Sequence, residues 1–142
     1  MTGVQTWALP ISLGPGFTSQ GDAEVILKGY IQWGDDVIPR LRGMFAFVLW
    51  DRRQRRLLMA RDRLGQKPLH YAWSDGRLLF GSEIKAILAW SGMARHPDLE
   101  ATHHYLSFRC VPPPHPALAG VHHLPPAPYL VAEALGPSRT EL

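Results

Sequence analysis

Two apolar runs joined by a short basic turn are the feature that most constrains the fold of this chain. Residues 44–50 (MFAFVLW) form a continuous apolar run with three aromatic side chains, and this composition is typical of a strand buried on both faces. Residues 51–55 are polar, and residues 56–61 return as a second strand, which predicts a β-hairpin. Its tip is rich in arginine: Arg52, Arg53, Arg55 and Arg56. We interpret the tip as a solvated turn whose charge repels other strands, with a docking patch as the alternative.

Helical spacing dominates the stretch ahead of this hairpin. Apolar residues recur there at the spacing of one helix face: Val25, Ile26, Tyr30 and Trp33. Asp22 precedes this run, and from the residues alone its favoured role is that of the helix cap. Gly34 is a natural end to the helix, and a second short helix is predicted from Asp35 to Gly43.

A second hairpin is predicted further along the chain. Its strands are residues 69–73 and 77–80, and Ser74-Asp75-Gly76 supplies the turn. Two apolar hairpins flanked by amphipathic helices predict an α+β fold in which the strands pair mostly antiparallel.

A short helix is predicted after Ser82 and another after Asp98, because both residue types are good N-caps. The first helix turns three apolar side chains inward: Ile84, Ile87 and Leu88. The second covers residues 99–106, with Leu99 and Tyr105 expected to be packed. Proline then dominates from residue 111 onward, which predicts an extended linker over residues 111–142 with one short strand at 129–132.

Composition argues against several functions. A formal charge of +3 without a long Lys/Arg run does not favour nucleic-acid binding. The sequence has no run of about 18 apolar residues, so no membrane span is predicted. The sequence has one cysteine, Cys110, which cannot form a disulfide within the chain. The default expectation is therefore a reducing compartment, the cytoplasm. The histidines include the adjacent pairs His103–His104 and His122–His123. Adjacent residues do not share a helix face, and we found no Cys or Glu at metal-site spacing, so no metal site is expected.

Five short blocks follow one another in a fixed order. They read GDAEVIL (21–27), RLRGMFAF (40–47), ARDRLGQKPL (60–69), FGSEIKA (80–86) and GVHHLPP (120–126). Each block is modest alone, but the set and its order resemble the glutaminase domain of glutamine-dependent asparagine synthetases. The resemblance covers roughly residues 17–132, the second half of that domain and the start of the linker that follows it.

This resemblance implies a class II glutamine amidotransferase domain, with a partial N-terminal-nucleophile (Ntn) hydrolase fold in which two antiparallel sheets are stacked between helical layers (αββα). In such enzymes an N-terminal cysteine attacks the side-chain amide of glutamine, a thioester forms and ammonia leaves. The ammonia then passes to a synthetase domain, where ATP, with magnesium, has activated aspartate. The resemblance therefore implies glutamine as the ligand of this chain, without a cofactor bound by the chain itself. It implies two partners, the synthetase domain and a second copy of the parent in a homodimer.

Two residues are carried over as glutamine-binding, Asp22 and Gly21. The resemblance implies that the Asp22 carboxylate holds the α-ammonium of free glutamine. A carboxylate at a helix N-terminus stays ionised and is a strong partner for an ammonium group. Gly21 would let the ligand approach the backbone closely. The blocks at 61–68 and 83–85 are interpreted as structural instead.

The sequence also departs from the family pattern. Thr2 stands where the resemblance places the nucleophilic cysteine, and Cys110 lies near the other end. The family blocks for the substrate carboxylate and the oxyanion hole belong ahead of Gly21. We therefore expect no catalytic residue here, and interpret the chain as a fragment of a parent enzyme, inactive alone. Residues 1–12 resemble a translated sequencing adapter and are predicted to be non-native. Residues 13–110 are then the partial amidotransferase domain, and residues 111–142 the linker.

Two other interpretations stay open. One is a related amidotransferase-ligase, such as a β-lactam synthetase or an enzyme of surface-polysaccharide assembly, because the acceptor pocket lies in the synthetase domain. The other is a non-catalytic glutamine-binding remnant that keeps Asp22.

Overall fold

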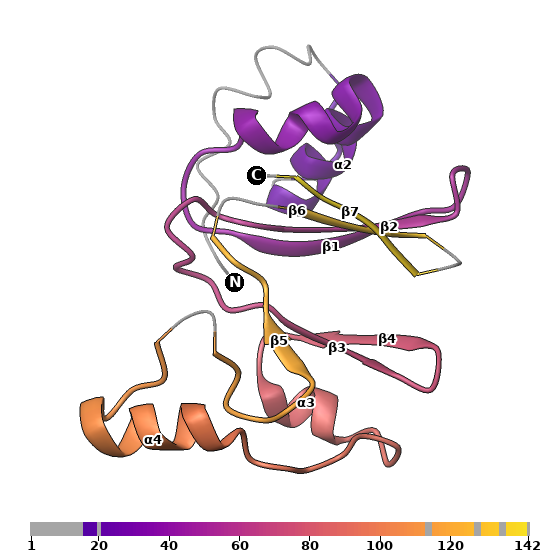
Figure 1. Ribbon diagram of the computed structural model, residues 1–142. Helices are drawn as coiled ribbons and strands as arrows, with labels where there is room; N and C mark the ends of the chain where they lie inside the picture. The colour runs from indigo at the N-terminus through magenta and orange to yellow at the C-terminus, as the bar shows by residue number, and fades with distance from the viewer. Residues whose placement is uncertain (1–15, 20, 113–114, 127–128, 134–135, 142) are drawn as a thin grey trace. The chain divides into compact units, whose positions relative to one another are not determined.

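The computed structural model describes residues 16–19, 21–112, 115–126, 129–133 and 136–141 of the 142-residue chain. The chain divides into two compact units, residues 1–45 and residues 46–142, and each is described here by itself (Figure 1). Residues 1–12, predicted to be non-native, lie outside the described residues. None of the helices in the described ranges has the length and apolar character needed to cross a membrane.

The first unit is helical. Helix α2 (Asp22–Trp33) is followed directly by the 3₁₀ helix η1 (Gly34–Arg40), and Gly34 makes the turn between them with φ +60°. Gly29 lets the two helices pack closely, because a Cβ at this position would lie 2.6 Å from Cγ2 of Val37. The predicted end of the first helix is confirmed, but the second helix is 3₁₀ and ends before the predicted Gly43.

The first sheet of the second unit has four strands in the order β1-β2-β6-β7, with antiparallel neighbours throughout. The strands are β1 (Ala46–Asp51), β2 (Arg56–Arg61), β6 (Tyr129–Glu133) and β7 (Gly136–Glu141). The predicted β1–β2 hairpin is confirmed. Its turn is held by Asp51, whose carboxylate accepts hydrogen bonds from the backbone N–H groups of Arg53 (2.8 Å) and Gln54 (2.9 Å).

The second sheet has three antiparallel strands in the order β4-β3-β5. They are β3 (His70–Ser74), β4 (Arg77–Gly81) and β5 (Val121–His123). The predicted β3–β4 hairpin is confirmed, and both turn residues have positive φ: Asp75 at 50° and Gly76 at 69°. A two-residue turn of this kind matches the twist of the strands it joins.

Two apolar clusters hold the second unit together. One joins β2 and β6 of the first sheet to the residues that flank β3 and β5 of the second: Met59, Leu69, Leu124, Leu130 and Ala132. The other packs helix α3 (Ile84–Leu88) against the second sheet through Ala72, Ile87, Met93 and Val121. Helix α4 (Leu99–Phe108) follows α3 in the chain, and the ribbon in Figure 1 shows α3 against the second sheet and α4 further from it. The architecture is α+β, as predicted.

Strand β1 is less buried than its composition predicts. Leu49 is buried, but the neighbouring Trp50 is 53% exposed and Met44 is 39% exposed. The expectation of a strand buried on both faces is therefore wrong. The physical reason is that β1 lies at the edge of its sheet and pairs with one strand, β2. Side chains on both faces of β1 therefore have a neighbouring strand on one flank only.

Of the two N-cap residues predicted for the short helices, one is confirmed and the other is wrong. Asp98 caps α4 as predicted, and its side chain accepts a hydrogen bond of 2.8 Å from the backbone N–H of Ala101. Ser82 does not cap α3, because Glu83 occupies the N-cap position and no side chain bonds there.

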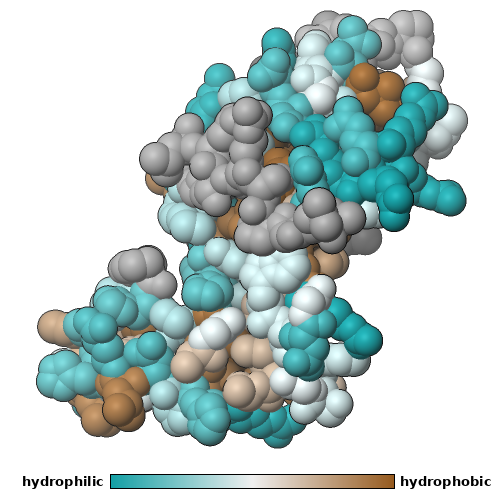
Figure 2. Space-filling model, turned by 45° about the vertical axis from the view of Figure 1, so that its right-hand side comes forward, coloured by the Kyte–Doolittle hydropathy of each residue, from teal (hydrophilic) through white to brown (hydrophobic). Residues whose placement is uncertain are grey.

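The packed face of α4 was also predicted wrongly. Ala101 is its buried residue, whereas Leu99 is 83% exposed and Tyr105 is 58% exposed. Figure 2 shows apolar patches within a largely hydrophilic surface at the end of the second unit that carries α4. Single exposed apolar side chains are common on protein surfaces, so the spacing of Leu99 and Tyr105 did not indicate burial.

The proline-rich stretch contributes strands to both sheets. The predicted strand at residues 129–132 is confirmed as β6, and it lies between β2 and β7. Two further strands, β5 and β7, were not predicted. β5 pairs with β3, with His123 opposite His70. The expectation of an extended linker was therefore incomplete, because pairing with strands far back in the sequence leaves little local pattern.

Candidate functional site

The N-terminus of α2 carries the predicted glutamine-binding residues. Gly21 is the N-cap residue, with φ −90° and ψ 140°, and no side chain makes a cap hydrogen bond. Asp22 is the first helical residue and is partly exposed. The interpretation that Asp22 caps the helix is therefore wrong. Its carboxylate stands in the first turn, where the helix dipole favours negative charge.

Glu24 fastens the preceding loop to this helix end. Its carboxylate accepts hydrogen bonds from the backbone N–H of Thr18 (2.9 Å) and of Ser19 (2.5 Å), and from the Thr18 hydroxyl (3.1 Å). The Lys28 ammonium lies 2.9 Å away on the next turn and also donates to the carbonyl oxygen of Gly16. Lys28 first, and then Ser19 and Thr18, lower the pKa of Glu24 below its ordinary value.

Glu24 is hydrogen-bonded to the loop at residues 16–19, a role that was not predicted from the sequence. The signal was present, because a glutamate three residues after the N-cap commonly reaches back to the preceding backbone. At Gly21 the backbone φ is ordinary, and an added Cβ would meet nothing closer than the Ser19 hydroxyl oxygen at 3.7 Å. The local backbone therefore does not itself require glycine at this position.

A second polar centre lies in the second unit, where β2 ends. Asp62 is 1% exposed, and its carboxylate accepts hydrogen bonds from three backbone N–H groups of the following loop: Leu64 (3.2 Å), Gln66 (2.9 Å) and Lys67 (3.0 Å). The loop also needs Gly65, which has φ +62° and where a Cβ would lie 2.9 Å from the Arg61 guanidinium carbon.

Arg61 joins this loop to the segment after β5. Its guanidinium donates to the carbonyl oxygens of Lys67 (2.5 Å), Gly65 and Leu124 (2.7 Å). It lies 3.0 Å from Nδ1 of His123. Burial lowers the Arg61 pKa, although Asp62 opposes this shift. Sequence analysis interpreted residues 61–68 as structural, and these bonds confirm that Arg61 and Asp62 hold the loop.

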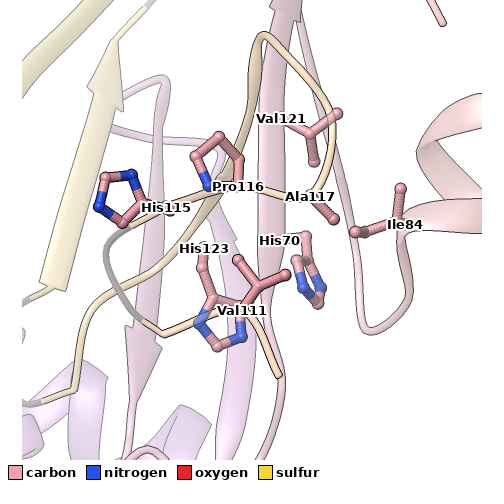
Figure 3. A pocket seen from close by; sticks show the side chains of 8 residues that line it. All are labelled: His70, Ile84, Val111, His115, Pro116, Ala117, Val121 and His123. Atoms are coloured by element: carbon pink, nitrogen blue, oxygen red, sulfur yellow. The ribbon is translucent and has the colours of Figure 1, made fainter. Parts of the chain in front are cut away.

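His70 and His123 lie side by side at a pocket of about 160 Å³ (Figure 3). Their ring centroids are 4.5 Å apart. His70 Nδ1 is 3.2 Å from the carbonyl oxygen of Ser82, so this nitrogen carries a hydrogen and donates. His123 Nδ1 faces a guanidinium that can only donate, so this nitrogen accepts.

The lining of this pocket is apolar apart from histidine. The residues are His70, Ile84, Val111, His115, Pro116, Ala117, Val121 and His123. No carboxylate, hydroxyl or thiol belongs to this described lining, so the side chains there that could act as a base or a nucleophile are the histidines. Cys110 is exposed, just beyond the end of α4.

Acidification is expected to destabilise the chain through His123. Burial first, then the charges of Arg61 and His70, lowers the His123 pKa from 6.5 to about 4. Between these values the unfolded chain binds a proton that the folded chain excludes, so stability present above pH 6.5 is lost as the pH falls towards 4. His123→Asn keeps an acceptor for Arg61 and removes the titration. Thermal melts at about pH 7 and pH 4.5 should show a smaller loss of Tm for the variant than for the parent chain; equal losses would contradict this assignment.

Comparison with solved structures gives the fold. The chain matches the structure of glutamine phosphoribosylpyrophosphate amidotransferase from Bacillus subtilis with a TM-score of 0.61 and 18% sequence identity. The match covers 96% of this chain and 26% of that protein. At this identity the likeness concerns the fold alone, and it confirms the predicted Ntn-hydrolase architecture.

The family follows from the sequence. The model of the glutamine amidotransferase domain matches residues 9–141, and the chain belongs to this family. Asparagine synthetase [glutamine-hydrolyzing] 3 of Bacillus subtilis is 48% identical over 85 residues, which is 60% of this chain and 13% of that protein. A putative glutamine-hydrolysing asparagine synthetase of Mycobacterium bovis is 43% identical over 111 residues, 76% of this chain and 17% of that protein.

These relatives are much longer than the matched region. The chain spans less than a fifth of the length of either asparagine synthetase. The family match also extends through β5, β6 and β7 and so includes most of the stretch that sequence analysis treated as a linker. The boundaries predicted at residues 12 and 110 stay predictions.

Proposed function

We propose that this chain is the glutamine-recognising part of a glutamine-hydrolysing asparagine synthetase. In the complete enzyme, glutamine is hydrolysed to glutamate and ammonia, and the ammonia amidates aspartate that ATP, with magnesium, has activated on a separate synthetase domain. The single observation that carries this proposal is the family match over residues 9–141 together with asparagine synthetase relatives of up to 48% identity.

Asp22 is the residue we propose for substrate recognition. Its carboxylate stands in the first turn of α2, where the helix dipole favours negative charge. Glu24, in the same turn, is held by Thr18, Ser19 and Lys28. An ionised carboxylate makes a charge-assisted bond to the α-ammonium of free glutamine, and glutamine within a peptide has no such group. The same bond therefore supports affinity and selects the free amino acid.

We expect Asp22→Asn to weaken glutamine binding by roughly 10- to 100-fold, because a hydrogen bond to a charged group is worth about 1.5–3 kcal/mol. Glutamine titrated into the ¹⁵N-labelled chain should shift the amide resonances of residues 21–24. Nα-acetylglutamine, which lacks the ammonium, should bind the parent chain as weakly as glutamine binds the variant.

Asp36→Asn is the matched control, because Asp36 is an exposed carboxylate of the same unit. It should leave glutamine binding unchanged. Equal affinity of the parent chain for glutamine and Nα-acetylglutamine would contradict the role of Asp22. Release of glutamate from glutamine by the purified 142-residue chain, above a heat-killed control, would contradict the expectation from the sequence that this polypeptide is inactive alone.

A further inference from the structure

Three metal-ligating side chains meet beside α4. Glu100 and His104 lie one turn apart on this helix, and His115 belongs to the segment that follows it. Oε1 of Glu100 lies 3.9 Å from Nε2 of His104 and 3.8 Å from Nε2 of His115. One ligand atom from each of the three lies within 4.8 Å of the others. We propose that these three residues, the α4 cluster, bind one divalent transition-metal ion of the zinc class.

The donor set selects the kind of metal. Two imidazoles and one carboxylate suit zinc, copper or nickel, whereas magnesium and calcium prefer oxygen ligands alone. With metal–ligand bonds of about 2.0–2.2 Å, tetrahedral ligand atoms lie roughly 3.3–3.5 Å apart. The measured separations of 3.8 and 3.9 Å therefore need to close by only about half an ångström. Glu100 is 67% exposed on its side chain, so water can occupy a fourth position.

The two histidines are positioned by their surroundings. The His104 ring stacks on Phe108 at 5.9 Å and 25°, and its centroid lies 5.0 Å from that of His115. The backbone N–H of His115 donates to the carbonyl oxygen of Pro112 at 3.2 Å. In Figure 3 the His115 ring points away from His70 and His123. His115 also lines the pocket, so the α4 cluster and the pocket of His70 and His123 share this one residue.

His104 also has an unexplained buried atom. Its Nδ1 is buried and has no hydrogen-bond partner among the described residues. Such an atom costs free energy in the folded chain unless something binds it. A metal ion on Nδ1 would remove this cost, whereas a metal ion on Nε2 would leave Nδ1 without the partner that the second nitrogen of a ligating histidine usually has. The orphaned nitrogen therefore favours a ligand on Nδ1 of His104.

Sequence analysis expected no metal site because it found no glutamate at suitable spacing. That statement is wrong for Glu100 and His104, which are four residues apart and share a helix face. His103, the other histidine of α4, is exposed and outside the cluster. The third ligand, His115, comes from a separate segment, and only the tertiary structure brings it within reach.

Zinc binding by the full 142-residue chain tests the proposal. Isothermal titration with zinc chloride at about pH 7.5 should show one high-affinity site. Glu100→Gln, His104→Gln and His115→Gln should each weaken this site by at least about tenfold, because each removes one of three protein ligands. His103→Gln, a matched histidine on the same helix, should keep the parent affinity.

A second measurement separates metal binding from folding. Zinc added to the ¹⁵N-histidine-labelled chain should move the imidazole resonances of His104 and His115 but not those of His70 and His123. Magnesium should move none of them. The α4 cluster would be an ion pair only, and the proposal overturned, if zinc left the His104 and His115 resonances in place. Equal loss of zinc affinity in His103→Gln and His104→Gln would also overturn it.

Discussion

Replacing Asp62 by alanine should lower the free energy of unfolding by about 4 kcal/mol, the largest single effect we expect. The carboxylate is 1% exposed and accepts three backbone hydrogen bonds from the loop that follows β2. Its loss leaves these N–H groups without their acceptor. It also leaves Arg61 buried without the neighbouring negative charge. Urea unfolding monitored by circular dichroism measures the change.

Two variants control for this result. Asp62→Asn keeps one acceptor oxygen and should cost about half as much, because some of the backbone bonds survive without the charge. Asp36→Asn, at an exposed position, should change stability by less than about 0.5 kcal/mol. If Asp62→Ala lost less than about 1 kcal/mol, the loop would not depend on this carboxylate.

Leu124→Ala should cost about 3 kcal/mol through a cavity between the two sheets. Leu124 is fully buried in the cluster that includes Met59 of the first sheet and Leu130 of β6. Its backbone N–H donates to Leu69 at 2.8 Å, and its carbonyl oxygen accepts from Arg61. Alanine keeps both backbone bonds, so the expected loss reports packing alone. The same urea titration measures it.

Leu106→Ala is the matched control, because Leu106 is 77% exposed on α4. The same truncation there should cost less than about 0.5 kcal/mol. Similar losses at Leu124 and Leu106 would show that the cluster between the sheets does not carry the stability we assign to it.

The candidate site was predictable in part. Asp22 could be selected from its block and from the expected start of α2, and the structure places it in the first helical turn. The role of Glu24 was missed although its spacing from Gly21 carries a known signal. Arg61 was correctly interpreted as structural, but its contacts with His123 and Leu124 could not be read from the sequence. These contacts depend on how β5 pairs with β3, a strand about fifty residues earlier in the chain.

The sequence alone determined those parts of the fold that depend on residues close together in the chain. The hairpins β1–β2 and β3–β4, the turn at Asp75 and Gly76, and the Asp98 cap all follow from short-range patterns. The tertiary structure alone decided which strands join the hairpins and which side chains are buried. β5 and β6 find partners far back in the chain, and α4 brings Glu100 and His104 to His115. The physical reason is that long-range pairing is set by packing across the whole unit, which no local period encodes.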